Sequence, residues 1–405
     1  MNNSRRSFIE KMGTGLVAGS ILPTVGMTSG FTQDPSGRDP IDVQLGPLFD
    51  PTELKEAPLP KIIPPAKRVG YCIVGLGHLS LQQILPGFAQ SKLARPVALV
   101  SGDAAKAQKV AAQYGIDSKN IYTYQNFDQI RNNPEIEAVY IVLPNSMHEE
   151  FVIRAAKAGK DILCEKPMAT SSASAQRMID ACKAAGKKLM IAYRIQYEPK
   201  NNLVRQWVKE ETFGKVKIIE SFHGQNQGDP GQWRQNKKMA GGGPLPDVGI
   251  YNINTTRFLL GNEPLWVSAS LIQPKNDVRF KEIEESLMFQ MGFPKDVIAY
   301  GGCSYGVHKC ARYRCMTDKG AWFGMDPAFG YSGLQIELSQ AKEKYEYKQQ
   351  VLMEDKQQFA TELDYFAQCI LHNIEPFTNG EEGLRDMIII ESMYKSAEAG
   401  QRVQL

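Results

Sequence analysis

Three side chains of the 405-residue sequence have types that suit proton transfer: Lys166, Asp247 and Tyr251. When an alcohol gives up a hydride, a base must take its hydroxyl proton, and the same group returns a proton in the reverse reaction. Free tyrosine titrates near about 10, so it needs a neighbouring cation to act as a base at neutral pH. Lys166, between Glu165 and Pro167, is a candidate for that cation.

An apolar run that leads into a glycine turn indicates a dinucleotide site. Val69–Val74 enters Gly75-Leu76-Gly77-His78-Leu79-Ser80, and a plausible amphipathic helix then continues to Gln90. The first glycine permits the tight turn, the second lets the backbone approach a pyrophosphate, and the helix N-terminus presents free N–H groups. Ser80 replaces the third glycine, where a small residue still allows close packing. The residues expected to hold the phosphates are Gly75, Leu76, Gly77 and His78.

Further apolar runs alternate with helical segments, which is typical of a doubly wound parallel sheet. The runs are Pro96–Val100, Glu137–Leu143, Asp161–Cys164 and Lys188–Ala192. Such sheets bind ligands at the carboxyl ends of their strands. The candidates for cofactor contact at these ends are Leu143, Asn145, His148, Glu165, Lys166 and Arg194. Tyr197 is a candidate for the substrate side of the same crevice. Two alternatives stay open: His148 as a structural histidine, and Arg194 or Tyr197 as a solvated side chain.

The end of the second strand bears on the choice of dinucleotide. An NAD enzyme places an Asp or Glu there to accept from the ribose 2′-OH. This strand instead ends at Val100-Ser101-Gly102, and Lys106 lies one helical turn further along the chain. Ser101 can donate to a 2′-phosphate and Lys106 can neutralise it, so the pattern favours NADP. Asp103 is near enough in the sequence to reach a ribose, which leaves NAD open.

Two longer motifs carry a family resemblance. Cys164-Glu165-Lys166-Pro167 follows a late strand of the dinucleotide half, and Gly241-Gly242-Gly243-Pro244-Leu245-Pro246-Asp247-Val248-Gly249-Ile250-Tyr251 lies in the second half. Both resemble the diagnostic motifs of the glucose-fructose oxidoreductase/inositol dehydrogenase (Gfo/Idh/MocA) family, and the likeness runs from Gly70 to the C-terminus. Within that family the chain resembles the periplasmic glucose-fructose oxidoreductases.

The resemblance implies roles for named residues. It makes Tyr251 the proton donor and acceptor, Lys166 its cationic neighbour, and Asp247 a group that binds a sugar hydroxyl or tunes the proton relay. It also places Trp233 and Arg234 in a substrate loop. An exposed indole edge suits a sugar face, while a packing anchor is the alternative for the tryptophan.

The second half predicts a mostly antiparallel sheet, because apolar alternation recurs between turns. The alternating runs are Val216–Phe222, Trp266–Ile272, Ser286–Met291, Val297–Tyr305, Ala311–Met316 and Ala321–Met325. Helices over Gln357–His372 and Gly383–Ala399 fit the family's return of the chain onto its first domain. The expected fold class is α/β: an N-terminal Rossmann doubly wound parallel sheet, then an α+β domain with a large, mostly antiparallel open sheet. Such an open sheet needs cover, so we expect a homodimer or homotetramer.

The first 30 residues have the layout of a twin-arginine export signal. Ser4-Arg5-Arg6-Ser7-Phe8-Ile9 precedes a weakly apolar, glycine-rich segment without acidic residues. The next stretch is rich in Pro, Asp and Gly and predicts an extended arm that packs on a neighbouring surface, with a floppy spacer as the alternative. The expected order is signal 1–30, arm 31–67, NADP-binding Rossmann domain 68–192, and substrate-binding and oligomerisation domain 193–405.

Composition excludes several function classes. With 47 basic and 44 acidic residues the net charge is +3, spread too evenly for a basic stripe, so nucleic acid is not an expected partner. No uninterrupted apolar run reaches the roughly 18 residues of a membrane span. The seven cysteines are scattered without a CxxC pair, so no metal site is expected.

Together these features favour a periplasmic oxidoreductase that transfers hydride between sugars. An exported enzyme meets no pool that regenerates a dissociable nicotinamide cofactor, so it should be exported folded by the twin-arginine machinery with NADP tightly bound. It would recycle the cofactor by oxidising an aldose to its lactone and reducing a ketose or aldose to an alditol. The alternatives are a glycosidase that uses bound NAD(P) for transient oxidation, an ordinary sugar dehydrogenase, and a non-catalytic sugar sensor, which would not need Lys166, Asp247 and Tyr251.

Overall fold

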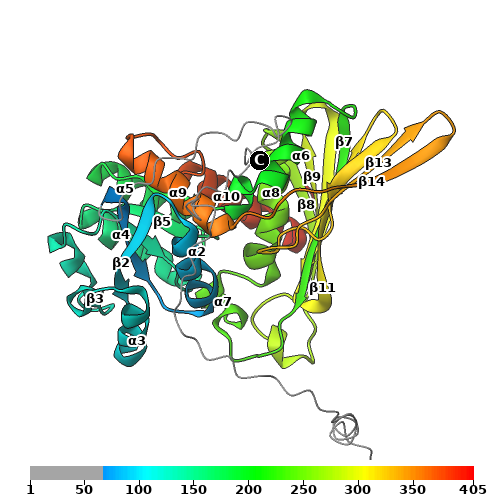
Figure 1. Ribbon diagram of the computed structural model, residues 1–405. Helices are drawn as coiled ribbons and strands as arrows, with labels where there is room; N and C mark the ends of the chain where they lie inside the picture. Colours follow the sequence, from blue (N-terminus) through cyan, green and yellow to red (C-terminus); the bar gives the residue numbers. More distant parts are fainter. Residues whose placement is uncertain (1–66) are drawn as a thin grey trace, which may run out of the picture. The chain divides into compact units, whose positions relative to one another are not determined.

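The computed structural model describes residues 67–405, so the expected export signal and nearly all of the expected arm lie outside the described residues. Two sheets organise the described part (Figure 1). No helix within residues 67–405 is both long and apolar enough to cross a membrane.

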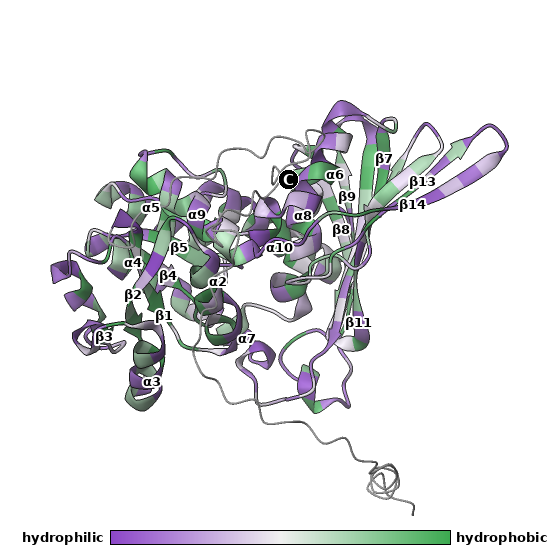
Figure 2. Cartoon of the chain, viewed as in Figure 1, coloured by the Kyte–Doolittle hydropathy of each residue, from purple (hydrophilic) through white to green (hydrophobic). Residues whose placement is uncertain are grey.

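The first sheet is parallel, and its strands are largely hydrophobic (Figure 2). Their spatial order is β3 (Ile121–Tyr122), β2 (Ala94–Val100), β1 (Val69–Val74), β4 (Ala138–Ile141), β5 (Asp161–Glu165) and β6 (Leu189–Ala192). The helices between the strands are α2 (Leu85–Gln90), α3 (Ala104–Tyr114), α4 (His148–Lys157) and α5 (Ser172–Ala185). All residues of β1, β4, β5 and β6 are buried, as expected for a parallel sheet with both faces covered. The Rossmann half of the expected fold class is therefore confirmed.

The second sheet is antiparallel except for one pair, β7 with β10. Its order is β14 (Tyr345–Val351), β13 (Ile336–Lys342), β12 (Ala321–Met325), β11 (Gly306–Thr317), β7 (Val216–Asn226), β10 (Val297–Ser304), β9 (Ser286–Phe293), β8 (Trp266–Ile272) and β15 (Val403–Gln404). The mostly antiparallel sheet is thus confirmed. Strands β13, β14 and β15 were not predicted from the sequence patterns. For β14 the reason is that the strand is exposed along almost its whole length and hydrophilic (Figure 2).

Two C-terminal helices connect the two sheets. The helix α9 (Gln358–Leu371) packs on the first sheet, where the Tyr71 hydroxyl donates to the Leu363 carbonyl oxygen over 3.0 Å. The helix α10 (Gly380–Ala399) packs against β8 of the second sheet and against α5 and β6 of the first. Both helices were expected, and α10 contacts strands of both sheets.

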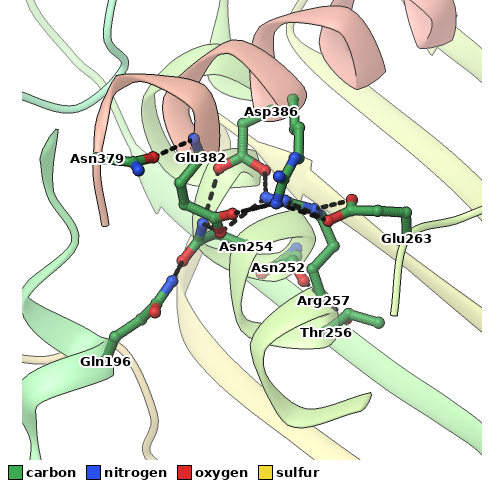
Figure 3. A network of polar contacts seen from close by, with 10 residues as sticks. Gln196, Asn252, Asn254, Thr256, Arg257, Glu263, Asn379, Glu382 and Asp386 are labelled. Carbon is green, nitrogen blue, oxygen red and sulfur yellow. Dashed lines mark hydrogen bonds and ion pairs between the residues drawn. The ribbon is translucent and has the colours of Figure 1, made fainter. Parts of the chain in front are cut away.

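A buried charge network fixes α8 (Ile250–Leu260) against α10 (Figure 3). Arg257, which is 3% exposed, donates to three carboxylates: Glu263, Glu382 and Asp386. Asn254, on the same helix, donates to Asp386 over 2.9 Å and accepts from Gln196 over 2.8 Å. Gln196 belongs to the 3₁₀ turn Arg194–Tyr197 that follows β6. The network therefore sets the position of α8 relative to that turn.

Candidate active site

Asp247 is the centre of a charged cluster. The Lys166 Nζ donates to its carbonyl oxygen over 2.6 Å and to Oδ1 over 3.3 Å. Arg234 Nε donates to Oδ2 over 3.0 Å, and the Tyr305 hydroxyl donates to the same oxygen over 2.7 Å. Burial opposes ionisation, but the charges of Arg234 and Lys166 outweigh it and hold the pKa of Asp247 well below its usual range. Asp247 is therefore a carboxylate at any pH where the protein functions.

Tyr251 lies one helical turn beyond Asp247 and is flanked by two cations. Lys166 Nζ lies 4.6 Å from the centre of its ring. The Arg194 guanidinium lies 5.1 Å from that centre, and its Nη2 donates to the Tyr251 hydroxyl over 3.2 Å. Burial opposes the charge on Lys166, but its Coulombic interactions with Tyr251, Asp247 and Glu165 raise the pKa of the lysine above its ordinary value. Both cations are placed to stabilise negative charge on the phenol oxygen when its proton leaves.

Local geometry explains how the two motifs meet. Lys166 is the last residue before a cis peptide bond to Pro167, just past the end of β5. Asp247 lies in a single π-helical turn, Leu245–Gly249, that runs directly into α8. The preceding glycines approach neighbours closely: a Cβ on Gly243 would lie 2.5 Å from the Glu284 carbonyl oxygen. The motif therefore needs small residues there to place the π-helical turn over the end of the first sheet.

Arg194 holds a loop as well as the phenol. Its Nη2 donates to the Phe329 carbonyl oxygen over 2.6 Å, and its Nη1 donates to the Gly330 carbonyl oxygen over 2.9 Å and to Gln358. The side chain is buried, which excludes the solvated alternative. Sequence reasoning expected Arg194 at the cofactor, whereas its Nη1 and Nη2 are used on the site tyrosine, Gln358 and the loop, and its buried Nε has no partner among residues 67–405.

Three further aromatic side chains surround Tyr251, and sequence reasoning missed them. The His223 ring lies 5.4 Å from the Tyr251 ring, and the Phe329 ring stacks on Tyr251 at 5.7 Å. Burial lowers the pKa of His223 to about 3, so its imidazole is neutral. Tyr331 lies with its ring 4.6 Å from the Arg194 guanidinium and remains 45% exposed. An exposed, anchored aromatic ring beside the proton-transfer group suits the C–H face of a sugar.

The substrate candidates separate into two places. Arg234 joins the Asp247 cluster, and its guanidinium lies 4.4 Å from the ring centre of its neighbour Trp233, which is half-buried. Tyr197 does not join them. Its hydroxyl lies 2.6 Å from Thr378 Oγ1 and its ring packs against Tyr365 and Phe377. The expected substrate contact of Tyr197 is corrected: the 3₁₀ turn directs this side chain into a core.

The glycine turn fits a pyrophosphate. Gly75 has φ +97°, and a Cβ there would lie 2.3 Å from the Val142 carbonyl oxygen, whereas a Cβ on Gly77 would meet nothing within 4 Å. The Ser80 hydroxyl donates to the Gly75 carbonyl oxygen over 2.6 Å and locks the turn. Gly77 and His78 are exposed, while Leu76 is buried, so Leu76 offers only its backbone. The open space at Gly77 is where a phosphate can approach the backbone.

The end of β2 can accept a 2′-phosphate. Ser101 Oγ accepts from the Asp103 backbone N–H over 3.0 Å, and Asp103 Oδ1 accepts from the Lys106 backbone N–H over 2.9 Å. Asp103 thereby caps α3, so its carboxylate is engaged by the helix. Lys106 is exposed at the first turn of that helix.

The remaining cofactor candidates tie loops together. His148 is fully buried, with Nε2 2.9 Å from the Leu143 carbonyl oxygen and Nδ1 3.0 Å from the Pro167 carbonyl oxygen. His148 is therefore a structural histidine, which is the alternative that the sequence left open. Asn145 donates to the Ala240 carbonyl oxygen over 2.8 Å, and Glu165 accepts from the Tyr140 hydroxyl over 2.7 Å. These contacts order the strand ends around Lys166.

Comparisons with known proteins show the family of the chain. Residues 69–193 match the family model "Oxidoreductase family, NAD-binding Rossmann fold", and residues 202–322 match the GFO/IDH/MocA C-terminal domain. The chain is 32% identical to a D-xylose 1-dehydrogenase [NADP(+)] of Haloarcula marismortui, over 83% of this chain and 93% of the relative. It is 26% identical to D-xylose 1-dehydrogenase (NADP(+)) 2 of Haloferax volcanii, over 82% and 98%.

Among solved structures, the chain is similar to aldose-aldose oxidoreductase from Caulobacter crescentus complexed with glycerol. The two are 40% identical with a TM-score of 0.80, and the match covers 84% of this chain and 100% of that structure. The similarity therefore extends through both sheets.

Proposed function

The chain belongs to the Gfo/Idh/MocA family of oxidoreductases, and on that premise we propose that it transfers hydride between sugars on a tightly held NADP. It is an NADP-dependent enzyme that acts on the CH–OH groups of sugars, as its relatives do. The proposal adds three points: the exchange between two sugars, the tight cofactor, and Tyr251 as the acid and base.

The main observation that supports the proposal is the contact of Tyr251 with the two cations Lys166 and Arg194. NADP supplies the hydride acceptor and donor when it is bound. Tyr251 takes the hydroxyl proton of one sugar and returns it to the carbonyl oxygen of the next, while Lys166 and Arg194 stabilise the phenol oxygen in between. Asp247, ionised and fixed by Arg234 and Tyr305, accepts a hydrogen bond from a sugar hydroxyl and orients the ring.

The cofactor residues follow from the geometry of the first sheet. The Gly75–Gly77 turn would hold the pyrophosphate, and Ser101 with Lys106 would hold the 2′-phosphate. Asp103 uses Oδ1 to cap α3, so this oxygen is engaged by the helix and less available to a ribose 2′-OH.

Export motivates both the tight cofactor and the exchange reaction. The twin-arginine pattern of residues 1–30 indicates that the protein reaches the periplasm folded. An enzyme there cannot draw on a cytoplasmic cofactor pool, so it should reoxidise its own NADPH with a second sugar. The aldose-aldose oxidoreductase from Caulobacter crescentus supports this reaction type. The second candidate is an ordinary NADP-dependent sugar dehydrogenase, which the two D-xylose dehydrogenase relatives favour.

One experiment separates the two candidates. The purified mature protein is denatured, and the released nucleotide is identified by mass. The native protein is then given an aldose alone, a ketose alone, both together, and an aldose with added NADP⁺. Exchange predicts bound NADP(H) and turnover without added NADP⁺, either with two different sugars or with one aldose that serves as both donor and acceptor. Turnover that needs added NADP⁺, with no nucleotide released from fresh protein, would establish the ordinary dehydrogenase.

The outer face of the second sheet supports a homo-oligomer. Paired residues of β7, β8, β9 and β10 leave apolar side chains exposed on one face: Ile218, Ile272, Met288, Ile298 and Tyr300. A second copy of the chain is the occupant we propose, because a sheet face with this many exposed apolar residues needs cover. Light scattering after gel filtration should find a dimer or tetramer, and Ile298→Arg should shift it toward the monomer, while the Lys348→Glu change on the hydrophilic β14 should not.

A further inference from the structure

Two buried carboxyl groups share one tyrosine behind the proposed active site. The Tyr140 hydroxyl lies 2.7 Å from Glu165 Oε1 and 3.4 Å from Glu362 Oε2. Tyr140 and Glu362 are fully buried, and Glu165 is 8% exposed. The three residues come from β4, from the end of β5 next to Lys166, and from α9. The proton transfer described above uses none of them.

Hydrogen-bond counting decides how the three groups are protonated. A phenol has one proton and can donate it to only one acceptor. Tyr140 contacts two carboxyl oxygens, so if it donates to the nearer one, on Glu165, the Glu362 carboxyl must itself be the donor to the phenol oxygen. Both contacts are hydrogen bonds with one proton each only when one of the two carboxyl groups is protonated.

The surroundings identify Glu362 as the protonated one. Its Oε1 is buried and has no hydrogen-bond partner among residues 67–405, which is far more costly for a carboxylate than for a neutral acid. Burial raises the pKa of Glu362 well above its usual range, and the nearby charge of Glu165 adds to this. Burial also raises the pKa of Glu165, but the hydrogen bond from Tyr140 and the charges of Lys166 and Arg194 oppose it.

Other titratable groups around Glu362 do not change this balance. Tyr71 on β1 and Tyr197 in the turn after β6 are phenols whose pKa burial raises well above the ordinary value, so they are neutral. Arg194, in the same turn, is a cation whose charge lowers the pKa of Glu362, although burial outweighs it. Its Nη1 and Nη2 donate to Tyr251, Gln358 and the loop carbonyl oxygens, and its buried Nε has no partner among residues 67–405.

We propose that Glu362 is a neutral carboxylic acid that donates to Tyr140, which donates to Glu165, so that a single negative charge sits at the carboxyl end of β5. Glu362 is thus a positioning residue for Glu165. Ligands of such sheets bind at the carboxyl ends of the strands, so this charge favours the oxidised nicotinamide, which is cationic, over the reduced one. This consequence rests on the proposed function, whereas the protonation of Glu362 does not.

The first test measures unfolding of the full chain in urea between pH 5 and pH 8, with Glu362→Gln compared with wild type. A carboxyl whose folded pKa is raised loses stability as pH rises from its unfolded value, about 4.3, to its folded value. The wild-type unfolding constant should therefore rise relative to that of the variant by up to tenfold per pH unit. Glu354→Gln, at an exposed position, is the matched control and should keep the wild-type pH dependence. A ratio that stays constant across this range would overturn the proposal.

A second measurement does not depend on the glutamine variant. At pH 7.5 the wild-type infrared spectrum should contain the C=O stretch of a protonated carboxyl group, and Tyr140→Phe should shift that band by removing its hydrogen-bond partner. A band that does not respond to Tyr140→Phe would contradict the chain of donors.

The expected preference for NADP⁺ over NADPH is tested by a separate binding measurement. Protein is equilibrated with mixtures of NADP⁺ and NADPH and desalted, and the bound ratio is measured after release. Glu165→Gln should lower the preference for NADP⁺ several-fold, and Glu362→Gln should leave it unchanged. An unchanged ratio in Glu165→Gln overturns the bias toward oxidised cofactor, whereas absence of any bound nucleotide in wild type would instead overturn the proposed function.

Discussion

Lys166 donates twice to Asp247, over 2.6 Å to the carbonyl oxygen and over 3.3 Å to Oδ1. The same ammonium lies 4.6 Å from the ring centre of Tyr251. One cation from the first sheet thus ties together the carboxylate and the phenol of the second half. The proton-transfer group is therefore assembled only when both halves have folded.

Tyr251→Phe should lower turnover by about 10² to 10⁴-fold, because general acid–base groups contribute on that order. The variant should still hold its nucleotide, since the phenol oxygen is the only atom removed. Turnover is measured with two sugars, and the nucleotide is quantified after denaturation. Sugar turnover close to that of wild type would exclude Tyr251 as the acid and base.

Lys166→Met should lower turnover to a similar extent and shift the pH profile of the remaining activity toward higher pH, because the phenol loses one of its two cations. Combined with Tyr251→Phe, the effect should not add, since groups that act as one unit give similar losses singly and together. Additive losses in the double variant would show that the two residues act independently.

Arg194→Met should damage both stability and turnover. It leaves the buried carbonyl oxygen of Phe329 without the Arg194 donor and the Gly330 carbonyl oxygen with the Gln358 donor alone, which costs on the order of 1 to 3 kcal/mol in the free energy of unfolding. It also removes the donor to Tyr251. Urea unfolding and two-sugar kinetics test the two effects. The matched control is Arg205→Met on the surface of α6 (Pro199–Glu210), and equal stability of the two variants would contradict the role of Arg194.

His223 should make the protein sensitive to acid. Its folded pKa of about 3 lies below the value of about 6.5 for free histidine, so the unfolded state takes up a proton first as pH falls. The stability that neutral His223 contributes is therefore complete above about pH 6.5 and is lost as pH falls toward 3, by up to about 2 kcal/mol at pH 5. His223→Gln should flatten the fall in the free energy of unfolding between pH 7.5 and pH 5, and His308→Gln, at an exposed position, should not.

Ser101→Asp should move the nucleotide preference from NADP toward NAD, because it places a carboxylate where the 2′-phosphate is expected. A charge-assisted contact of this kind is worth roughly 1 to 3 kcal/mol. The preference is measured as the ratio of bound NADP to bound NAD after equilibration with both. If the ratio does not change, Ser101 does not line the adenosine ribose.

Much of the fold could be predicted from local patterns. Strands β8 and β12 have the bounds that apolar alternation indicates, and β1 ends where the glycine turn begins. A strand buried on one face alternates apolar and polar residues, and a strand buried on both faces is a continuous apolar run. Such strands can therefore be predicted from the sequence. The exposed strand β14 has neither pattern and was missed.

Part of the site was visible for a similar reason. Lys166, Asp247 and Tyr251 stand in compact motifs whose glycines and prolines mark unusual backbone, and the structure brings the three side chains together. His223 belongs to β7, whose pattern marks only a half-buried sheet, and Tyr305 lies at the bend between β10 and β11. Nothing local distinguishes them from neighbouring residues, so neither could be chosen in advance.

The sequence by itself determined the two-sheet fold class, the dinucleotide turn and the residue types available for proton transfer, because each depends on periodicity or on a short motif. The tertiary structure decided which distant groups meet: Tyr305 and Arg234 on Asp247, Arg194 on Tyr251, and Glu362 on Tyr140. It also directs the Tyr197 side chain into the hydrophobic core, away from the site. These contacts join residues up to 222 positions apart, and their energies depend on burial and orientation that only the packed chain supplies.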